Sequence, residues 1–233
     1  RAIILTHGTD TLEETAWFLH RVLAPTKPVV LTCAMRPATA LAPDGPQNLC
    51  DAVLVAADER VRGVVVVCAG WLHGAEEVVK VHTWRTDAFD SGDAGPLGMI
   101  EAGGLRLFRQ PAVGRVERGL WERVQAAQAL PWVELVFSYA DTQGYLVRSL
   151  LAMQGAADIP PLRGLVVAGT GNGTVHMALA EALKEAQARG VVVWRGTRCA
   201  RGRPVTSGCS GGDWPLAEPS AIKARLSLAL SLL

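Results

Sequence analysis

A short polar loop near the start of the chain holds side chains that could do chemistry. Thr9, Asp10 and Thr11 follow an apolar run at residues 2–6 and precede a segment whose apolar residues have helical spacing. The amino terminus of a helix stabilises negative charge that develops beside it. A threonine there is a candidate nucleophile or proton relay if a base activates it. The alternative is that these residues only form the turn and cap the helix.

Lys80 is a second candidate. It belongs to the apolar run 78–81, and His82, Thr83 and Thr86 follow it. Partial burial can lower the pKa of a lysine so that it acts as a base, whereas most lysines in strands simply face water. The spacing alone leaves both interpretations open.

A glycine-rich segment, G-T-G-N-G at residues 169–173, is a weaker candidate. It follows an apolar run and could cradle a phosphate, but it is not G-x-G-x-x-G and no P-loop lysine follows it. A tight turn between a strand and a helix is therefore the favoured interpretation. His176, near the start of that helix, fits a surface or capping residue better than a catalyst.

Apolar periodicity predicts the elements that position these residues. Amphipathic helices are expected at residues 11–23, 44–56, 144–154, 175–189 and 221–232. Thr11 and Asp44 are the expected amino-terminal caps of the first two helices, with Glu14 completing a capping box after Thr11. Short β-branched or apolar runs predict strands at residues 2–6, 28–32, 64–69, 105–108, 133–137, 164–168 and 191–194. His73 and Gly74 are expected in a hairpin turn that leads into a strand at residues 76–81.

Strands that alternate with helices predict an α/β fold with parallel sheets. The periodicity loosens between residues 87 and 130, so we expect two domains. The larger, N-terminal domain at residues 1–107 has a mostly parallel sheet with flanking helices. Residues 108–130 form a linker, and a smaller, parallel α/β domain occupies residues 131–233. Ligands bind at the carboxyl ends of strands in such sheets, where the loops at residues 7–11, 33–45 and 169–174 fall.

Composition excludes several classes of protein. Hydrophobic residues make up 49% and charged residues 19% of the chain, and the net charge is +1, which argues against a broad basic surface for nucleic acid. The apolar runs are too short to span a membrane. Five cysteines without a C-x-x-C pair argue against structural zinc and favour buried free thiols in a reducing compartment. Cys199 and Cys209 alone lie in loop-like sequence where a bridge could form.

Residues 4–16 resemble the second signature of the bacterial-type L-asparaginases. Further matches follow in that family's order at residues 27–31, 34–37, 44–49, 80, 88–91, 95–98, 169–173 and 223–225. The resemblance covers essentially the whole chain. Residues 6–16 together with residues 34–37 are its most specific part.

The resemblance implies hydrolysis of L-asparagine to L-aspartate and ammonia, with no metal and no organic cofactor. It implies a threonine nucleophile and a relay formed by Thr9, Asp10 and Lys80. Thr9 would lie near the scissile amide, Lys80 would take its proton or keep it activated, and Asp10 would hold Lys80 and bind the α-ammonium of the substrate. Gly8 and the backbone around Ala34 would complete the substrate site. The family also implies a homo-oligomer, a dimer of dimers.

Some features depart from the family pattern. The first signature, Thr-Gly-Gly-Thr-Ile-Ala, carries the family's other threonine and has no match here. We therefore expect the 233 residues to be an incomplete protein that hydrolyses asparagine barely or not at all by itself. Thr174 replaces an asparagine of broad-specificity members, and only Asp213 and Glu218 are available where those members have a glutamate, which argues against strong glutaminase activity. Pro25 replaces a disulfide cysteine of a secreted branch, which favours a cytoplasmic protein.

Three alternatives remain beside an asparaginase. The first is a glutaminase-asparaginase, and the second is the amidase subunit of a tRNA-dependent amidotransferase. Residues 34–37, Ala-Met-Arg-Pro, look more like the free asparaginases. The third is a catalytically incomplete homologue that keeps Asp10 to bind an amino acid. Such a binding protein would have no use for Lys80, which argues against it.

Overall fold

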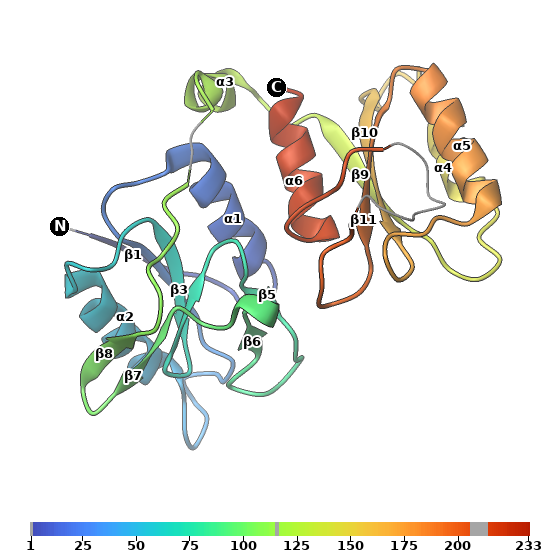
Figure 1. Cartoon of the computed structure of the whole chain (residues 1–233). Coiled ribbons are helices and arrows are strands. Elements are labelled where there is room, and N and C mark those ends of the chain that lie inside the picture. Colours follow the sequence, from blue (N-terminus) through green and yellow to red (C-terminus); the bar gives the residue numbers. More distant parts are fainter. Residues whose placement is uncertain (1, 115–116, 206–213) are drawn as a thin grey trace. The chain divides into compact units, whose positions relative to one another are not determined.

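The computed structural model describes residues 2–114, 117–205 and 214–233. The chain divides into two compact units, unit 1 at Arg1–Arg118 and unit 2 at Gly119–Leu233 (Figure 1). This division lies within the segment that the sequence predicts as a linker, residues 108–130. Helix α3, Leu120–Ala126, also lies there, where little helical periodicity is visible in the sequence.

Unit 1 alternates strands and helices in its first half and contains strands with short connections in its second half. Its elements are β1 (Ile3–Thr6), α1 (Leu12–Leu23), β2 (Val29–Thr32), α2 (Gly45–Ala57), β3 (Val64–Cys68), β4 (Trp71–Gly74), β5 (Val79–Lys80), β6 (Phe89–Asp90), the 3-10 helix η1 (Gly92–Ala94), β7 (Gly98–Glu101) and β8 (Gly104–Leu107).

Within residues 2–114, six strands form one sheet in the order β1-β2-β3-β4-β7-β8. β1, β2 and β3 are parallel, whereas β4, β7 and β8 each pair antiparallel with the strand before them in that order. The predicted α/β class is confirmed, but the prediction of a mostly parallel sheet is wrong for the second half. Tight turns join β3 to β4 and β7 to β8, and a connection that short can join only antiparallel strands.

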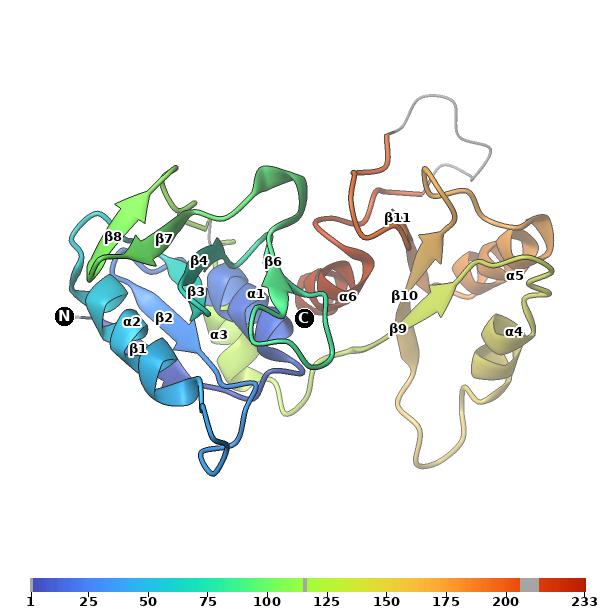
Figure 2. The same ribbon diagram turned by 90° about the horizontal axis from the view of Figure 1, so that it is seen from below.

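The central strands of unit 1 are buried on both faces, which explains their uninterrupted apolar sequences. One face of β2 and β3 packs with Leu12 and Ala16 of α1. The other face packs with Ala52 and Val55 of α2. Successive side chains of a strand point to opposite faces, so each strand contributes to both cores. Figure 2 shows α1 and α2 on opposite sides of these strands.

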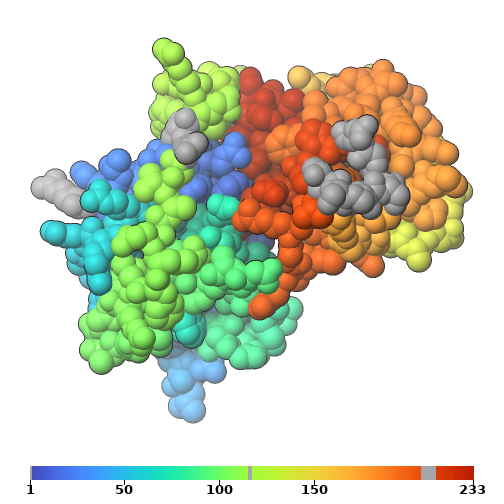
Figure 3. Space-filling view, viewed as in Figure 1, coloured from blue at the N-terminus to red at the C-terminus, as the bar shows by residue number. Residues whose placement is uncertain are grey.

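The two helices of unit 1 begin close to the predicted residues, but their caps differ from the prediction. Thr11 is the residue before α1, and Asp44 the residue before α2, yet neither side chain makes a capping hydrogen bond with a backbone N–H of its helix. Glu13 and Glu14 instead place acidic side chains in the first turn of α1, where the helix dipole favours them. The Asp44 carboxylate accepts hydrogen bonds from the backbone of the preceding loop, from Met35 N at 2.9 Å and Arg36 N at 2.8 Å. That loop protrudes from unit 1 (Figure 3, light blue).

The predicted hairpin turn at His73 and Gly74 is wrong. The turn lies at Ala69 and Gly70, whose φ angles of 50° and 77° are left-handed. Two successive left-handed residues form the tight turn whose twist matches that of paired strands. His73 and Gly74 instead lie in β4, opposite Val66 and Val65. The predicted strand at residues 76–81 is reduced to β5, which pairs with β6 in a two-stranded ladder outside the main sheet.

Unit 2 is a smaller, three-layered α/β arrangement. After α3 its elements are β9 (Trp132–Phe137), α4 (Tyr145–Ala152), β10 (Leu162–Gly169), α5 (Met177–Ala188), β11 (Val192–Thr197) and α6 (Ala221–Ser231). Within residues 117–205, β11, β10 and β9 form a parallel sheet in that order. α4 and α5 cover one face and α6 covers the other (Figure 1). None of the described helices is both long and apolar enough to cross a membrane.

Candidate active site

The loop between β1 and α1 carries the first two residues of the predicted relay. β1 is parallel to β2, and His7 N continues the pairing by donating to Thr32 O at 2.9 Å. The His7 ring stabilises the loop. Its Nδ1 donates a hydrogen bond to Gly8 O at 2.7 Å, and its Nε2 lies 3.0 Å from the Thr15 hydroxyl of α1. Thr9 and Asp10 follow at the carboxyl end of the strand. The loop therefore opens at the sheet edge where parallel strands place ligand-binding residues.

Lys80 approaches this loop from the β5–β6 ladder. Its backbone pairs with Phe89, and Val81 N donates to Ala88 O at 2.8 Å. The side chain is 18% exposed, whereas the Asp10 side chain is 91% exposed. The lysine stem is thus largely packed against protein, and the carboxylate beside its tip is open to solvent.

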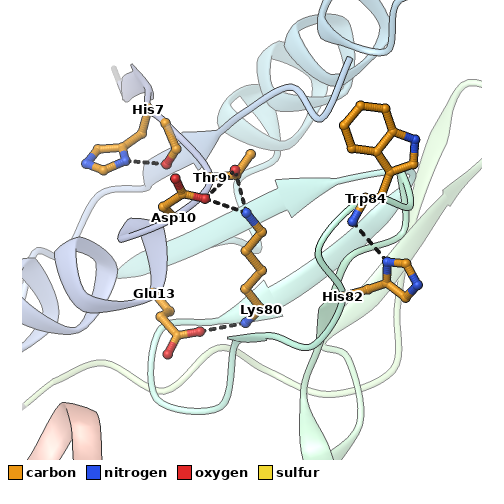
Figure 4. A network of polar contacts seen from close by, with 8 residues as sticks. His7, Thr9, Asp10, Glu13, Lys80, His82 and Trp84 are labelled. Atoms are coloured by element: carbon orange, nitrogen blue, oxygen red, sulfur yellow. Dashed lines mark hydrogen bonds and ion pairs between the residues drawn. The ribbon is translucent and has the colours of Figure 1, made fainter.

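The side chains of Thr9, Asp10 and Lys80 form one hydrogen-bonded cluster (Figure 4). Lys80 Nζ donates to Thr9 Oγ1 at 2.8 Å and to Asp10 Oδ1 at 2.6 Å. The Thr9 hydroxyl donates to the same Asp10 oxygen at 3.3 Å. The Lys80 hydrogen bond and ammonium charge, together with the Thr9 hydroxyl, hold the pKa of Asp10 below its usual 3.8. The cluster joins a hydroxyl, a cation and a carboxylate, and a cation beside a hydroxyl favours its ionised, nucleophilic form.

A pocket of about 340 Å³ opens next to this cluster. Asp10 and Lys80 line it together with Val81, His82 and Thr83. The turn that follows is held by His82 Nδ1, which accepts from Trp84 N and Arg85 N at 3.0 Å each. A larger hollow of about 730 Å³ lies between α2 and the turns at residues 69–70 and 101–103, and its lining contains none of the three clustered residues. The smaller pocket is therefore the candidate binding site for a substrate of the cluster.

Gly8 and Ala34, the two further residues predicted to bind substrate, both lie at the carboxyl ends of neighbouring parallel strands. Gly8 precedes Thr9 directly, and a side chain at Gly8 would have open space around it. Ala34 follows β2 and is exposed. Asn48 of α2 anchors this segment by donating to Cys33 O at 2.9 Å and accepting from Ala69 N at 2.9 Å. Their roles in substrate binding stay predictions.

The described cysteines are all free. Cys33 and Cys68 are buried, as predicted, whereas Cys50 and Cys199 are exposed. The Cys33 and Cys68 sulfurs lie 3.7 Å apart. The contact with Cys33, together with burial, raises the pKa of the Cys68 thiol. Cys209, the predicted alternative partner of Cys199, lies outside the described residues. Among those that are described, no three His, Cys, Asp or Glu side chains are grouped to hold a metal ion.

The glycine-rich segment after β10 forms a tight turn, as the sequence favours. Thr170 and Thr174 exchange two backbone hydrogen bonds of 2.8 Å. A Cβ at Gly169 would lie 2.4 Å from the backbone of Gly173, so only glycine fits there. His176 precedes α5 without a side-chain cap bond. Of the two acidic residues considered for glutaminase activity, Glu218 pairs with Arg203 at 3.3 Å, and Asp213 lies outside the described part of the chain.

Comparisons with known proteins show the family to which this chain belongs. A model described as "Asparaginase, N-terminal" matches residues 1–113, and one described as "Glutaminase/Asparaginase C-terminal domain" matches residues 132–229. A glutaminase-asparaginase from Acinetobacter glutaminasificans is 34% identical over 99% of this chain and 70% of the relative. The chain belongs to the asparaginase family.

Other members of the asparaginase family support the same assignment. The crystal structure of a probable cytoplasmic L-asparaginase from Campylobacter jejuni superposes with a TM-score of 0.85 at 32% identity, over 99% of this chain and 73% of that one. A glutaminase-asparaginase from Pseudomonas fluorescens biotype A is 38% identical over 83% of this chain and 51% of the relative. A probable periplasmic L-asparaginase from Haemophilus influenzae is also 38% identical, over 85% and 55%. The chain thus spans about half the length of these last two relatives.

The sequence did not predict the polar contacts of two buried residues, Glu13 and His73. Glu13, 6% exposed, contacts the backbone of Lys80 at 2.5 Å. His73 of β4, 3% exposed, is hydrogen-bonded to Ser91 at 2.8 Å. The sequence contains a weak signal for Glu13, which lies only three residues after Asp10. It contains none for His73, whose partner is eighteen residues distant.

Burial of His73 predicts a loss of stability in acid. Burial lowers the pKa of His73 from 6.5 to about 4, and the nearby Asp90 charge opposes this only partly. Between those values the unfolded chain binds a proton that the folded chain rejects, so the free energy of unfolding falls as the pH falls from 6.5 to 4, by about 3 kcal/mol in total. In His73→Gln this part of the pH dependence should disappear. Urea unfolding of both proteins at pH 7, 5.5 and 4 measures it, and parallel curves would contradict the prediction.

Proposed function

We propose that this protein hydrolyses L-asparagine to L-aspartate and ammonia. The observation that carries the proposal is the contact of Lys80 Nζ with both Thr9 Oγ1 and Asp10 Oδ1. Membership of the asparaginase family supports it, as do the relatives whose names include asparaginase activity.

In this mechanism a threonine hydroxyl adds to the side-chain amide carbon of the substrate. Lys80 in its neutral amine form accepts the proton of the Thr9 hydroxyl, and Asp10 holds the ammonium group that results. The proton then moves to the departing nitrogen, so that ammonia leaves and an acyl-enzyme ester remains. Water hydrolyses the ester, which releases aspartate and returns the proton to the relay.

The same cluster recognises the amino-acid part of the substrate. The Asp10 carboxylate has one oxygen on Lys80 and is almost fully open to solvent, so it is free to accept a hydrogen bond from an α-ammonium. Gly8 leaves room beside Thr9, and the backbone at Ala34 faces the leaving amide. These three positions describe a site for a small zwitterionic amide.

Ammonia release from the full-length gene product tests the proposal. L-Asparagine should be hydrolysed with a kcat/KM at least about tenfold above that for L-glutamine, because an extra methylene displaces the amide from the relay. Comparable rates would favour a glutaminase-asparaginase, the name of two of the relatives. No ammonia from either amide above a heat-inactivated control would overturn the proposal.

We also propose that the protein is a homo-oligomer, a dimer of dimers. Four exposed, large apolar side chains near the ends of β9, α4 and α5 of unit 2 support this: Phe137, Tyr139, Tyr145 and Met177. These side chains flank two close contacts, the 3.0 Å hydrogen bond from His176 N to Ser138 Oγ and the approach of Gly144 to the Ala178 carbonyl. Exposed apolar surface of this kind marks association sites.

Sedimentation of the full-length protein tests this association. At micromolar concentration we expect a mass near four chains, and Tyr145→Glu should reduce it while leaving the unfolding temperature of the subunit unchanged. A compact monomer of the unaltered protein would contradict the proposal.

The cytoplasm is the proposed location. The similar Campylobacter jejuni structure is described as a probable cytoplasmic L-asparaginase, although the Haemophilus influenzae relative is described as periplasmic. The buried free thiols Cys33 and Cys68 suit a reducing compartment. Fractionation of the source cells, with immunodetection of the protein, decides between the two compartments.

A further inference from the structure

The hairpin that carries Lys80 is too small to fix the position of this residue by itself. β5 and β6 contribute two residue pairs and form a ladder outside the main sheet. An isolated two-stranded ribbon is only marginally stable. The lysine side chain adds several freely rotating bonds, so its ammonium group is held accurately only if the backbone at its base is held as well.

Glu13 supplies that restraint. One carboxylate oxygen accepts a hydrogen bond from Lys80 N at 2.5 Å, on the side of β5 that faces α1 (Figure 4). Glu13 is 6% exposed. Burying a carboxylate is costly unless hydrogen bonds compensate, and a bond from an amide to an ionised oxygen is roughly twice as strong as a neutral one.

Lys80 is consequently held at both ends by one short segment of the chain. Thr9 and Asp10 hold its ammonium group, and Glu13, three residues after Asp10, holds its backbone. Because α1 begins at Leu12, directly after the loop, these three acceptors lie within one continuous stretch of five residues. The residue directly after β6, Ser91, is hydrogen-bonded to His73 of β4 and so links this end of the ladder to the main sheet separately.

We propose that Glu13 is a positioning residue for Lys80, which sets the distance of the ammonium group from Thr9. This inference rests on the proposed asparaginase function only for its kinetic consequence. Glu13 is not itself among the residues that line the pocket, and it acts through the Lys80 backbone. A displacement of about 1 Å at a reacting group costs up to about a hundredfold in rate.

Matched substitutions separate this role from a general contribution to folding. Glu13→Met keeps an unbranched side chain of similar length but removes the acceptor, and Glu13→Gln keeps an acceptor. Glu14→Met is the control, because it removes the neighbouring charge from the same first helical turn. In the full-length protein, Glu13→Met should lower kcat for asparagine about tenfold to a hundredfold, with KM changed less than about threefold. Glu13→Gln should keep at least about a third of kcat, and Glu14→Met should remain within about twofold.

A second readout does not depend on asparagine hydrolysis. The chain has only four lysines, at positions 27, 80, 184 and 223, so acetylation by N-hydroxysuccinimide acetate can be followed at each by mass spectrometry. Lys184 is exposed and serves as the internal reference. Glu13→Met should raise the rate at Lys80 relative to Lys184 at least about threefold, since the released side chain leaves Thr9 and Asp10 more often.

The outcomes distinguish the two proposals. Faster labelling of Lys80 in Glu13→Met supports the positioning role even if the unaltered protein hydrolyses no asparagine, a result that would overturn only the proposed function. An unchanged labelling rate, or equal losses of kcat in Glu13→Met and Glu13→Gln, would overturn the positioning role. If Glu13→Met does not fold, Glu13→Ala, which also lacks an acceptor, takes its place in both measurements.

Discussion

Replacement of Lys80 by methionine is expected to lower kcat for asparagine by at least about a hundredfold, the range in which a positioned acid or base contributes. Lys80 Nζ is the group that contacts both Thr9 and Asp10, and methionine has a similar stem without the ammonium group. The stem of Lys80 is largely packed against protein, so an apolar replacement should keep that packing and the fold. The loss should therefore appear in kcat and in kcat/KM together, as expected when an interaction of the transition state is removed.

Lys27→Met is the control for this experiment, because Lys27 is an exposed lysine of unit 1. Its kinetics should match those of the unaltered protein. Thermal unfolding and circular dichroism should be unchanged in both variants. If Lys80→Met keeps more than about a tenth of kcat, a change of about 1.4 kcal/mol in the barrier, then Lys80 has no place in the relay.

Replacement of Asp10 by asparagine is expected to lower kcat/KM about a hundredfold or more, with a rise in KM as well as a fall in kcat. Two effects combine. The Lys80 ammonium loses the carboxylate that orients it, and the substrate loses the anion that binds its α-ammonium. A site built to hydrogen-bond a substrate group loses much affinity when that partner is removed.

A substrate analogue makes this test specific. Succinamic acid is asparagine without the α-amino group, so the unaltered protein should strongly prefer asparagine, and Asp10→Asn should hydrolyse the two at more similar rates. Asp58→Asn, which removes a carboxylate paired with Arg60 elsewhere in unit 1, is the control. If Asp10→Asn keeps the original preference for asparagine, then another group binds the ammonium.

The tests of Lys80, Asp10 and Glu13 address different parts of one arrangement. Asp10 contacts the ammonium group from the solvent side, and Glu13 holds the backbone from the buried side. Loss of Asp10 should therefore change substrate binding and rate, whereas loss of Glu13 should change mainly the rate. This difference in KM separates a residue that touches substrate from one that only positions the base.

The amino-acid sequence by itself determined the local elements and the identity of the polar loop. Leu12 and Ala16 have helical spacing, and the valines of β2 and β3 form unbroken runs. Those patterns predict α1 and two buried strands because they reflect how each segment meets its own neighbours. The motif at residues 4–16 also identified Thr9 and Asp10, since a family resemblance is read from adjacent residues.

The strand directions after β3 and the partner of Asp44 were decided by the tertiary structure. His73 looks like a turn residue in sequence, yet the left-handed pair Ala69 and Gly70 takes the turn and places His73 in the buried strand β4. Asp44 precedes a helix, as a capping residue does, but its carboxylate binds Met35 N and Arg36 N of the loop. The position of this turn and the hydrogen-bond partners of Asp44 depend on which backbone segments come close in space. The periodicity of the sequence contains no information about that.

The cluster of Lys80 with Thr9, Asp10 and Glu13 shows most clearly which features the sequence predicts and which only the tertiary structure decides. Seventy residues of chain separate Asp10 from Lys80, and composition or spacing alone left Lys80 as either a base or a solvated strand residue. Only the resemblance connected it to the loop. The orientation of Glu13 toward Lys80 N could not be predicted at all, because Glu13 and Glu14 have the same chemistry and only packing of α1 against the sheet decides which of them is buried. Contacts between distant segments depend on the packed geometry of the whole unit, so they leave no local pattern in the sequence.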